Sequence, residues 1–119
     1  MKPFLSRAAL LFIVMMGSDA HAHAFLLKSE PSVGATVPAP KTLRLEFSEA
    51  LELAFSGIDV ANGSGGAVPA RNIRLEGNDH KVLLADLPPL SPGAYRVKWH
   101  VVSVDTHRTE GDSAFSVKP

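Results

Sequence analysis

The sequence predicts an all-β domain, a Greek-key β-sandwich or small barrel of about seven strands. In Thr42–Phe47 and in Tyr95–Trp99, apolar residues alternate with polar ones, which is the pattern of a half-buried strand. Turn-forming residues interrupt the chain roughly every ten residues, a spacing typical of sandwiches and barrels. Beyond the N-terminal segment, no amphipathic pattern of helical period extends past a turn or two.

The other strand candidates are short apolar stretches bounded by turn residues. In chain order they are Phe25–Lys28, Gly57–Val60, Asn72–Leu75, Lys81–Leu84 and Ala114–Val117. Segments rich in Gly, Pro, Asn, Asp or Ser predict the breaks between strands. These are Pro31–Gly34, Pro38–Lys41, Asn62–Gly66, Gly77–Asp79, Pro88–Gly93 and Glu110–Asp112. Tyr95 follows one of these breaks, and Greek-key sandwiches often place a tyrosine at such a corner, which favours the sandwich.

The start of the chain has the pattern of a cleaved secretory signal. Lys2 and Arg7 form a short positive region, Ala8–Gly17 is apolar, and small residues follow. The apolar stretch is too short to span a bilayer, which takes ~20 residues, so a retained membrane anchor is the less favoured interpretation. Three cut sites fit the small residues, and they make either His21, His23 or Phe25 the first residue.

Composition excludes several classes of function. Lys2, Arg7 and Asp19 precede His23, so the 12 basic and 12 acidic residues of the whole chain become ten and eleven from His23 onward. We therefore expect no binding to nucleic acid or to anionic lipid, because no basic stripe exists. The sequence has no cysteine, so stability must come from a hydrophobic core rather than from disulfides. All three methionines also precede His23.

Two distant parts of the chain carry candidate metal ligands. A histidine at a new N-terminus can chelate a metal through its α-amine and one imidazole nitrogen. Asp105 and His107 are two positions apart, so in an extended chain their side chains point to the same side. Together these groups supply three nitrogens and one oxygen, a set that suits tetragonal Cu(II). On its own, the Asp105–His107 pair has a plainer interpretation as solvated loop residues.

The three cut sites would produce different metal chemistry. A chain beginning at His21 has a histidine in third position, which binds Cu(II) with two backbone amides. A chain beginning at His23 has a chelating terminal histidine on the domain itself. A chain beginning at Phe25 has neither histidine. The small residues alone do not choose among these sites.

The remaining polar candidates have weaker signals. Glu49 ends a predicted strand and is either an axial or outer-shell group of a metal site or a surface glutamate. We expect His80 to be solvated in a turn and His100 to be structural. Catalytic motifs are absent: there is no cysteine nucleophile, no G-x-S-x-G, no H-E-x-x-H and no glycine-rich phosphate loop. Ser103 lies too close to Asp105 and His107 in one strand for triad geometry.

In these residues the chain resembles the CopC family of periplasmic copper-binding proteins, in particular its short, YobA-like members. The resemblance spans His23–Lys118. It rests on His23 eight residues before Pro31, on Phe47-Ser48-Glu49, on Pro92-Gly93-x-Tyr95-x-Val97-x-Trp99, and on Val101-Val102-Ser103-Val104-Asp105-x-His107.

The resemblance implies a Greek-key sandwich of immunoglobulin-like appearance and a cut after Ala22. Residues 1–22 would then be the signal, and residues 23–119 the copper-binding domain. It also implies that His23, Asp105 and His107 are the Cu(II) ligands, with Glu49 as an axial or outer-shell group. The chain departs from the longer members in that Asn62–Arg71 contains no methionine, so we expect no separate Cu(I) site.

We therefore expect a monomeric periplasmic protein that binds Cu(II) to carry or buffer copper and that is not an enzyme. The family implies an inner-membrane copper transporter of the CopD type as its partner. The alternative is a copper monooxygenase, because such enzymes also chelate copper through a terminal histidine. One Trp and one Tyr give no evident aromatic platform for a polysaccharide, however, and a carboxylate ligand would occupy the position where oxygen binds.

Overall fold

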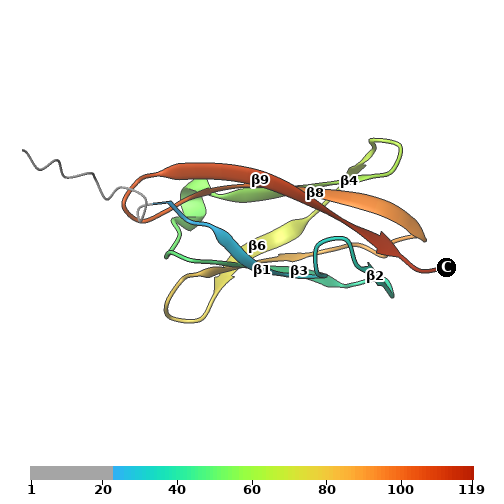
Figure 1. Ribbon diagram of the computed structural model, residues 1–119, viewed down its shortest axis with the longest axis horizontal. Coiled ribbons are helices and arrows are strands. Elements are labelled where there is room, and N and C mark those ends of the chain that lie inside the picture. The colour runs from blue at the N-terminus through green and yellow to red at the C-terminus, as the bar shows by residue number, and fades with distance from the viewer. Residues whose placement is uncertain (1–22) are drawn as a thin grey trace, which may run out of the picture.

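The structure is a computed structural model that describes residues 23–119, and these form two β-sheets packed face to face (Figure 1). The expected all-β sandwich is confirmed. The strands are β1 (Leu26–Glu30), β2 (Thr36–Val37), β3 (Thr42–Phe47), β4 (Gly57–Asn62), β5 (Ala67–Val68), β6 (Arg71–Glu76), β7 (Val82–Asp86), β8 (Gly93–Val102) and β9 (Arg108–Val117). One short 3₁₀ helix, η2 (Leu53–Phe55), precedes β4.

The predicted signal, residues 1–22, and two of the three predicted cut sites lie outside the described residues. Within residues 23–119, no helix has the length and apolar character needed to cross a membrane.

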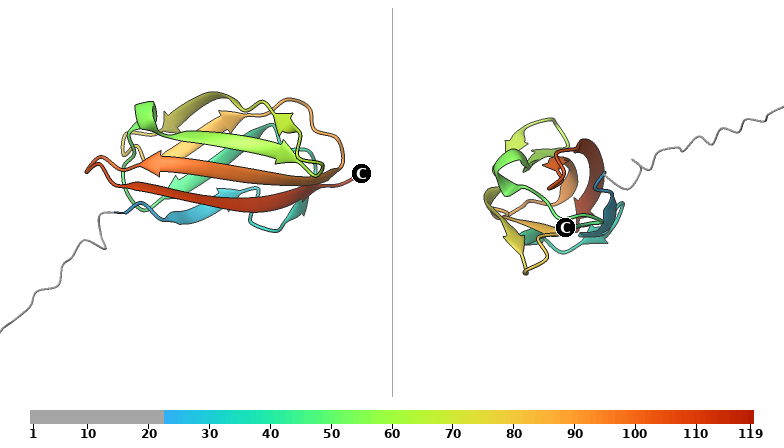
Figure 2. Two further views of the ribbon diagram at one scale, coloured as in Figure 1. Left: turned by 90° about the horizontal axis from the view of Figure 1, so that it is seen from above. Right: turned by 90° about the vertical axis from the view of Figure 1, so that its left-hand side faces the viewer.

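The strands divide between a four-stranded sheet, in the order β1-β3-β7-β6, and a five-stranded sheet, in the order β2-β9-β8-β4-β5. Neighbouring strands are antiparallel except for β2 and β9, which are parallel. The described part of the chain has nine strands rather than about seven, because β2 and β5 are two-residue strands with no periodic signal of their own. In Figure 2, β8 and β9 run side by side, and the loop that joins them projects at the end away from the C-terminus.

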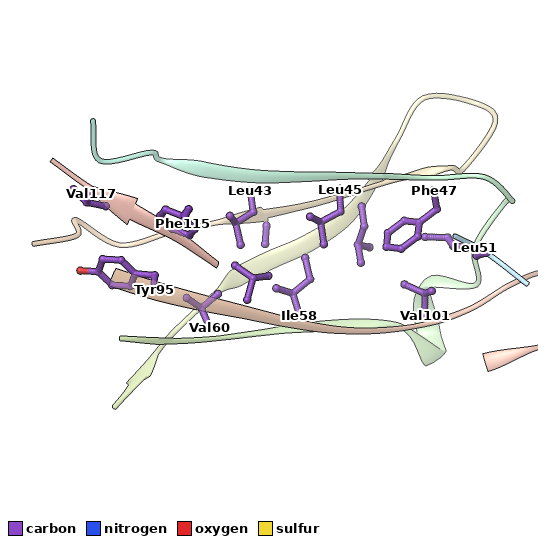
Figure 3. Close-up of a cluster of buried hydrophobic side chains, with 14 residues drawn as sticks. Leu43, Leu45, Phe47, Leu51, Ile58, Val60, Tyr95, Val101, Phe115 and Val117 are labelled. Atoms are coloured by element: carbon purple, nitrogen blue, oxygen red, sulfur yellow. The ribbon is translucent and has the colours of Figure 1, made fainter. Parts of the chain in front are cut away.

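The core lies between the two sheets and follows from the alternation in the sequence. Leu43, Leu45 and Phe47 of β3 all point into it, and Leu45 is completely buried. Figure 3 shows these side chains facing those of β4 and β8 across the sandwich. Tyr95 forms the predicted corner, since its hydroxyl donates a hydrogen bond of 2.6 Å to the carbonyl of Ser91.

The predicted break at Glu110–Asp112 is wrong, because this segment lies inside β9. Gly111 pairs with Trp99 in the ladder between β8 and β9. The indole covers Gly111 so closely that a Cβ atom there would lie 2.3 Å from Cζ2 of Trp99. Trp99 also packs edge-to-face on Phe47, with ring centroids 5.1 Å apart. Gly111 therefore makes room for an aromatic ring and does not form a turn.

Replacing Gly111 with alanine should destabilise the protein by about 1–3 kcal/mol, the usual cost of overpacking, because the indole must move. Urea unfolding followed by Trp99 fluorescence measures this. Gly63→Ala is the matched control, since the nearest atom to a Cβ at Gly63 is 3.5 Å away. Equal stability of the two variants would contradict the packing described for Trp99.

Candidate metal centre

Three segments that are distant in the sequence meet at one end of the sandwich. They are the N-terminal residues 23–25, the residues that follow β3, and the loop between β8 and β9. Figure 1 shows the start of the described chain, η2 and the β8–β9 loop together at this end. The backbone N–H of Ser48 donates to the carbonyl of Phe25, at 2.9 Å, and that of Val104 donates to the carbonyl of Ala50, at 3.0 Å.

The N-terminal segment is fixed by burial and by side-chain hydrogen bonds. Ala24 is 99% buried, with 1% of its surface exposed, and belongs to the core cluster. Phe25 donates its N–H to Oγ of Ser48, at 2.8 Å, and the Ser48 hydroxyl also lies 3.5 Å from the carbonyl oxygen of His23. Thr109 donates its hydroxyl to the carbonyl of Ala24, at 3.0 Å. These contacts place His23, which is half-buried, beside the β8–β9 loop.

Asp105 and His107 lie in a tight turn rather than in an extended strand, so the predicted reason for their convergence is wrong. The N–H of Thr106 donates to the carbonyl of Ser103, at 2.8 Å, and that of Ser103 donates to the carbonyl of His107, at 2.9 Å. Thr106 adopts the left-handed conformation, with φ of 75°. The turn, not the two-residue period of a strand, places the two side chains near each other.

The turn and the fixed N-terminal segment bring His23, Asp105 and His107 together. The imidazole rings of His23 and His107 are edge-to-face, with centroids 5.0 Å apart. Oδ1 of Asp105 lies 3.4 Å from Nδ1 of His107. Among residues 23–119, however, no three His, Asp or Glu side chains are arranged closely enough to hold a metal ion as they stand. The side chains are neighbours but do not yet converge on one point.

A buried serine controls the orientation of Asp105. Ser103 has only 1% of its surface exposed, and its hydroxyl donates to Oδ1 of Asp105. The same hydroxyl lies 3.3 Å from the carbonyl of His107. The hydrogen bond from Ser103 is the main cause that lowers the pKa of Asp105, and the neighbouring His107 lowers it further. Asp105 is therefore held as an anion, the form that binds a metal.

The other polar residues considered from the sequence, Glu49, His80 and His100, lie in three different parts of the fold. Glu49 is half-buried. Its neighbours Ser48 and Ala50 bond to the N-terminal segment and to Val104 respectively, so the backbone of Glu49 lies at the same end as the candidate ligands. His80 is exposed in the turn between β6 and β7. His100 lies on the outer face of the five-stranded sheet, with its ring against Gly57.

Sequence reasoning did not predict the roles of three hydroxyl residues at this end: Ser48, Ser103 and Thr109. Each is an ordinary strand or turn residue by its local pattern. Ser48 lies inside the Phe47-Ser48-Glu49 pattern and Ser103 lies two positions before Asp105, which are the only signals that set them apart. Their role follows from partners as far as 85 positions away in the chain.

Comparisons with known proteins identify the family of the chain. The model of the CopC domain family matches residues 26–118. The chain belongs to the CopC family. Protein YobA of Escherichia coli K12 is 38% identical over 112 residues, which cover 92% of this chain and 90% of YobA. Copper transport protein CutJ of Bacillus subtilis is 32% identical over 91% of this chain but only 20% of its own length.

The crystal structure of PcoC, a methionine-rich copper resistance protein from E. coli, has the same sandwich. Its TM-score is 0.75 at 35% identity, and the match covers 82% of this chain and 100% of PcoC. This CopC-family chain differs in composition from a methionine-rich protein, because its sequence contains no methionine after Met16.

Replacing Ser103 with alanine should raise the pKa of Asp105 towards its ordinary value, because the hydrogen bond to the ionised carboxylate is lost. A ¹³C NMR titration of the metal-free protein measures this directly. Asp86 is the internal control, because its own lowered pKa results from Asn72 and Arg74 and should not change. An unchanged Asp105 pKa would contradict the role given to Ser103.

The same variant should alter the dependence of stability on pH. A carboxyl group whose pKa is lowered by folding stabilises the protein at pH values above the pKa that the group has in the unfolded chain. That stabilisation is lost as the pH falls through the lowered folded value. In Ser103→Ala, Asp105 should therefore contribute a smaller loss of folding stability as the pH falls.

Proposed function

We propose that this CopC-family protein binds one Cu(II) ion per chain in the periplasm, as a copper carrier or buffer rather than an enzyme. The ligands are the α-amine and imidazole of His23, the carboxylate of Asp105 and the imidazole of His107. One observation carries the proposal: the rings of His23 and His107 are 5.0 Å apart, although 84 positions separate them in the sequence. Glu49 is an axial or outer-shell group of the same site.

The donor set fits the metal and its oxidation state. Two imidazoles, an amine and a carboxylate are ligands that favour a tetragonal Cu(II) centre. Soft thiol and thioether donors, which favour Cu(I), are absent from the sequence after Met16. The α-amine exists only in a chain that begins at His23, so the proposal includes a cut after Ala22 and a domain of residues 23–119. The amine is the donor that would complete a set whose side chains do not converge by themselves.

The position of the site supports transfer of copper to another protein. The side chains of His107 and Asp105 are 45% and 50% exposed, so an acceptor can reach a bound ion directly. Phe25 lies two positions after His23 and Val104 directly precedes Asp105, and both apolar side chains are exposed where an acceptor would approach. CutJ carries a segment like this chain within a longer copper transport protein. We therefore propose a monomer that exchanges copper with an inner-membrane transporter of the CopD type.

Replacing His107 with alanine should weaken Cu(II) binding by more than the ~10–100-fold that loss of an outer-shell partner costs, because a ligand is removed. Competition titration gives the affinity, and EPR gives the number of coupled nitrogens. His80→Ala is the matched control and should bind Cu(II) as the unmodified protein does. Equal losses in both variants, or a spectrum without nitrogen hyperfine coupling, would refute the proposed site.

A chain that keeps Ala22 ahead of His23 should bind Cu(II) more weakly than a chain that begins at His23. Every side chain is retained, but the added peptide bond turns the α-amine into an amide, which is not a ligand until it is deprotonated. Intact mass establishes the first residue, and the same titration gives the two affinities. If the two chains bound Cu(II) equally well, the amine would not be a ligand.

A further inference from the structure

Residues 23–25 lie just outside the regular ladder of the four-stranded sheet. The pairing of β1 with β3 begins at Leu26 opposite Phe47. Beyond this point one backbone bond remains, from the N–H of Ser48 to the carbonyl of Phe25 at 2.9 Å, and two hydroxyl side chains supply the other hydrogen bonds to this segment. Ser48 directly follows β3 of one sheet, and Thr109 belongs to β9 of the other.

The two hydroxyls contact three consecutive residues. Ser48 Oγ accepts the N–H of Phe25 at 2.8 Å and lies 3.5 Å from the carbonyl oxygen of His23. Thr109 Oγ1 donates to the carbonyl of Ala24 at 3.0 Å. The methyl group of Ala24 is buried in the core between them. The segment is therefore held by apolar contact on its inner side and by hydroxyl groups along its backbone.

Thr109 also connects the two histidines by a short path. It lies two positions after His107 in the chain, and its hydroxyl bonds to the residue next to His23. One hydrogen bond and two residues of β9 therefore set the separation between the rings. A terminal residue is otherwise free to swing about its backbone bonds, and ordering it when the metal arrives would oppose binding.

We propose that Ser48 and Thr109 are positioning residues that together form a hydroxyl clamp on residues 23–25 and hold His23 against His107 before copper binds. The inference rests on the proposed function, and it adds residues that do not touch the metal. Outer-shell partners of this kind orient the ligands of many metal sites.

The test compares Ser48→Ala and Thr109→Val with a variant that loses hydroxyl bonds elsewhere at the same end. In that control, Ser56→Ala, the lost hydroxyl accepts from the N–H of Val102 at 3.1 Å and donates to the carbonyl of Glu52 at 2.8 Å. None of these bonds involves residues 23–25. All variants begin at His23, and thermal unfolding of each records any general loss of stability.

In the metal-free protein, Ser48→Ala should lose the hydrogen-exchange protection of the Phe25 amide, while Ser56→Ala should keep it. With copper, Ser48→Ala and Thr109→Val should each bind Cu(II) ~10–100-fold more weakly and show altered EPR parameters. Thr109→Ser, which keeps the hydroxyl, should restore the affinity and the spectrum. Ser56→Ala should bind as the unmodified protein does.

The outcomes separate the clamp from the site itself. Lack of protection at the Phe25 amide in the unmodified protein would overturn the clamp whatever the copper results. Unchanged Cu(II) affinity in Ser48→Ala and Thr109→Val, or an equal loss of affinity in Ser56→Ala, would also overturn the clamp. In that case a loss of affinity in His107→Ala would still support the proposed function. If the unmodified protein did not bind Cu(II), the proposed function would fail, and the positioning role would fail with it.

Discussion

The antiparallel ladder between β8 and β9 is the constraint on which both the core and the candidate site depend. Its ten residue pairs run from Gly93 opposite Val117 to Val102 opposite Arg108. At one end, the ladder stacks Tyr95 on Phe115 within the core. In the middle, it sets the indole of Trp99 over Gly111. At the other end, it stops where the turn with Asp105 and His107 begins, so the register of the hairpin fixes where the turn projects.

The candidate site is built on this rigid support by hydroxyl groups rather than by charges. Ser103 donates to the carboxylate of Asp105, Ser48 contacts the backbone of the residues on either side of Ala24, and Thr109 donates to the carbonyl of Ala24 itself. Hydroxyl groups suit this position because they bond to the backbone and to carboxylates without adding a charge beside the candidate metal site. The core supports them without any disulfide, since the chain has no cysteine.

The geometry also explains how the site can be both ordered and accessible. The N-terminal segment is fixed through Ala24, which is buried, while the ring of His107 and the carboxylate of Asp105 are about half exposed. Order therefore comes from the backbone, and access comes from the side chains. The proposed role as a copper carrier requires both properties, because a fully enclosed ion cannot be reached without local unfolding.

The sequence by itself determined the class of fold, because burial of alternate residues in β3 and β8 follows directly from their two-residue period. It also singled out His23, Asp105 and His107, by the chemistry of their side chains and by a family resemblance. Only the tertiary structure decided that Glu110–Asp112 belongs to a strand, since the indole of Trp99 explains Gly111. Only the tertiary structure placed Ser48 and Thr109 beside the N-terminal segment. Ser48 and Thr109 are 23 and 85 positions away from the residues to which they bond, and no local pattern records which side chain will face so distant a residue.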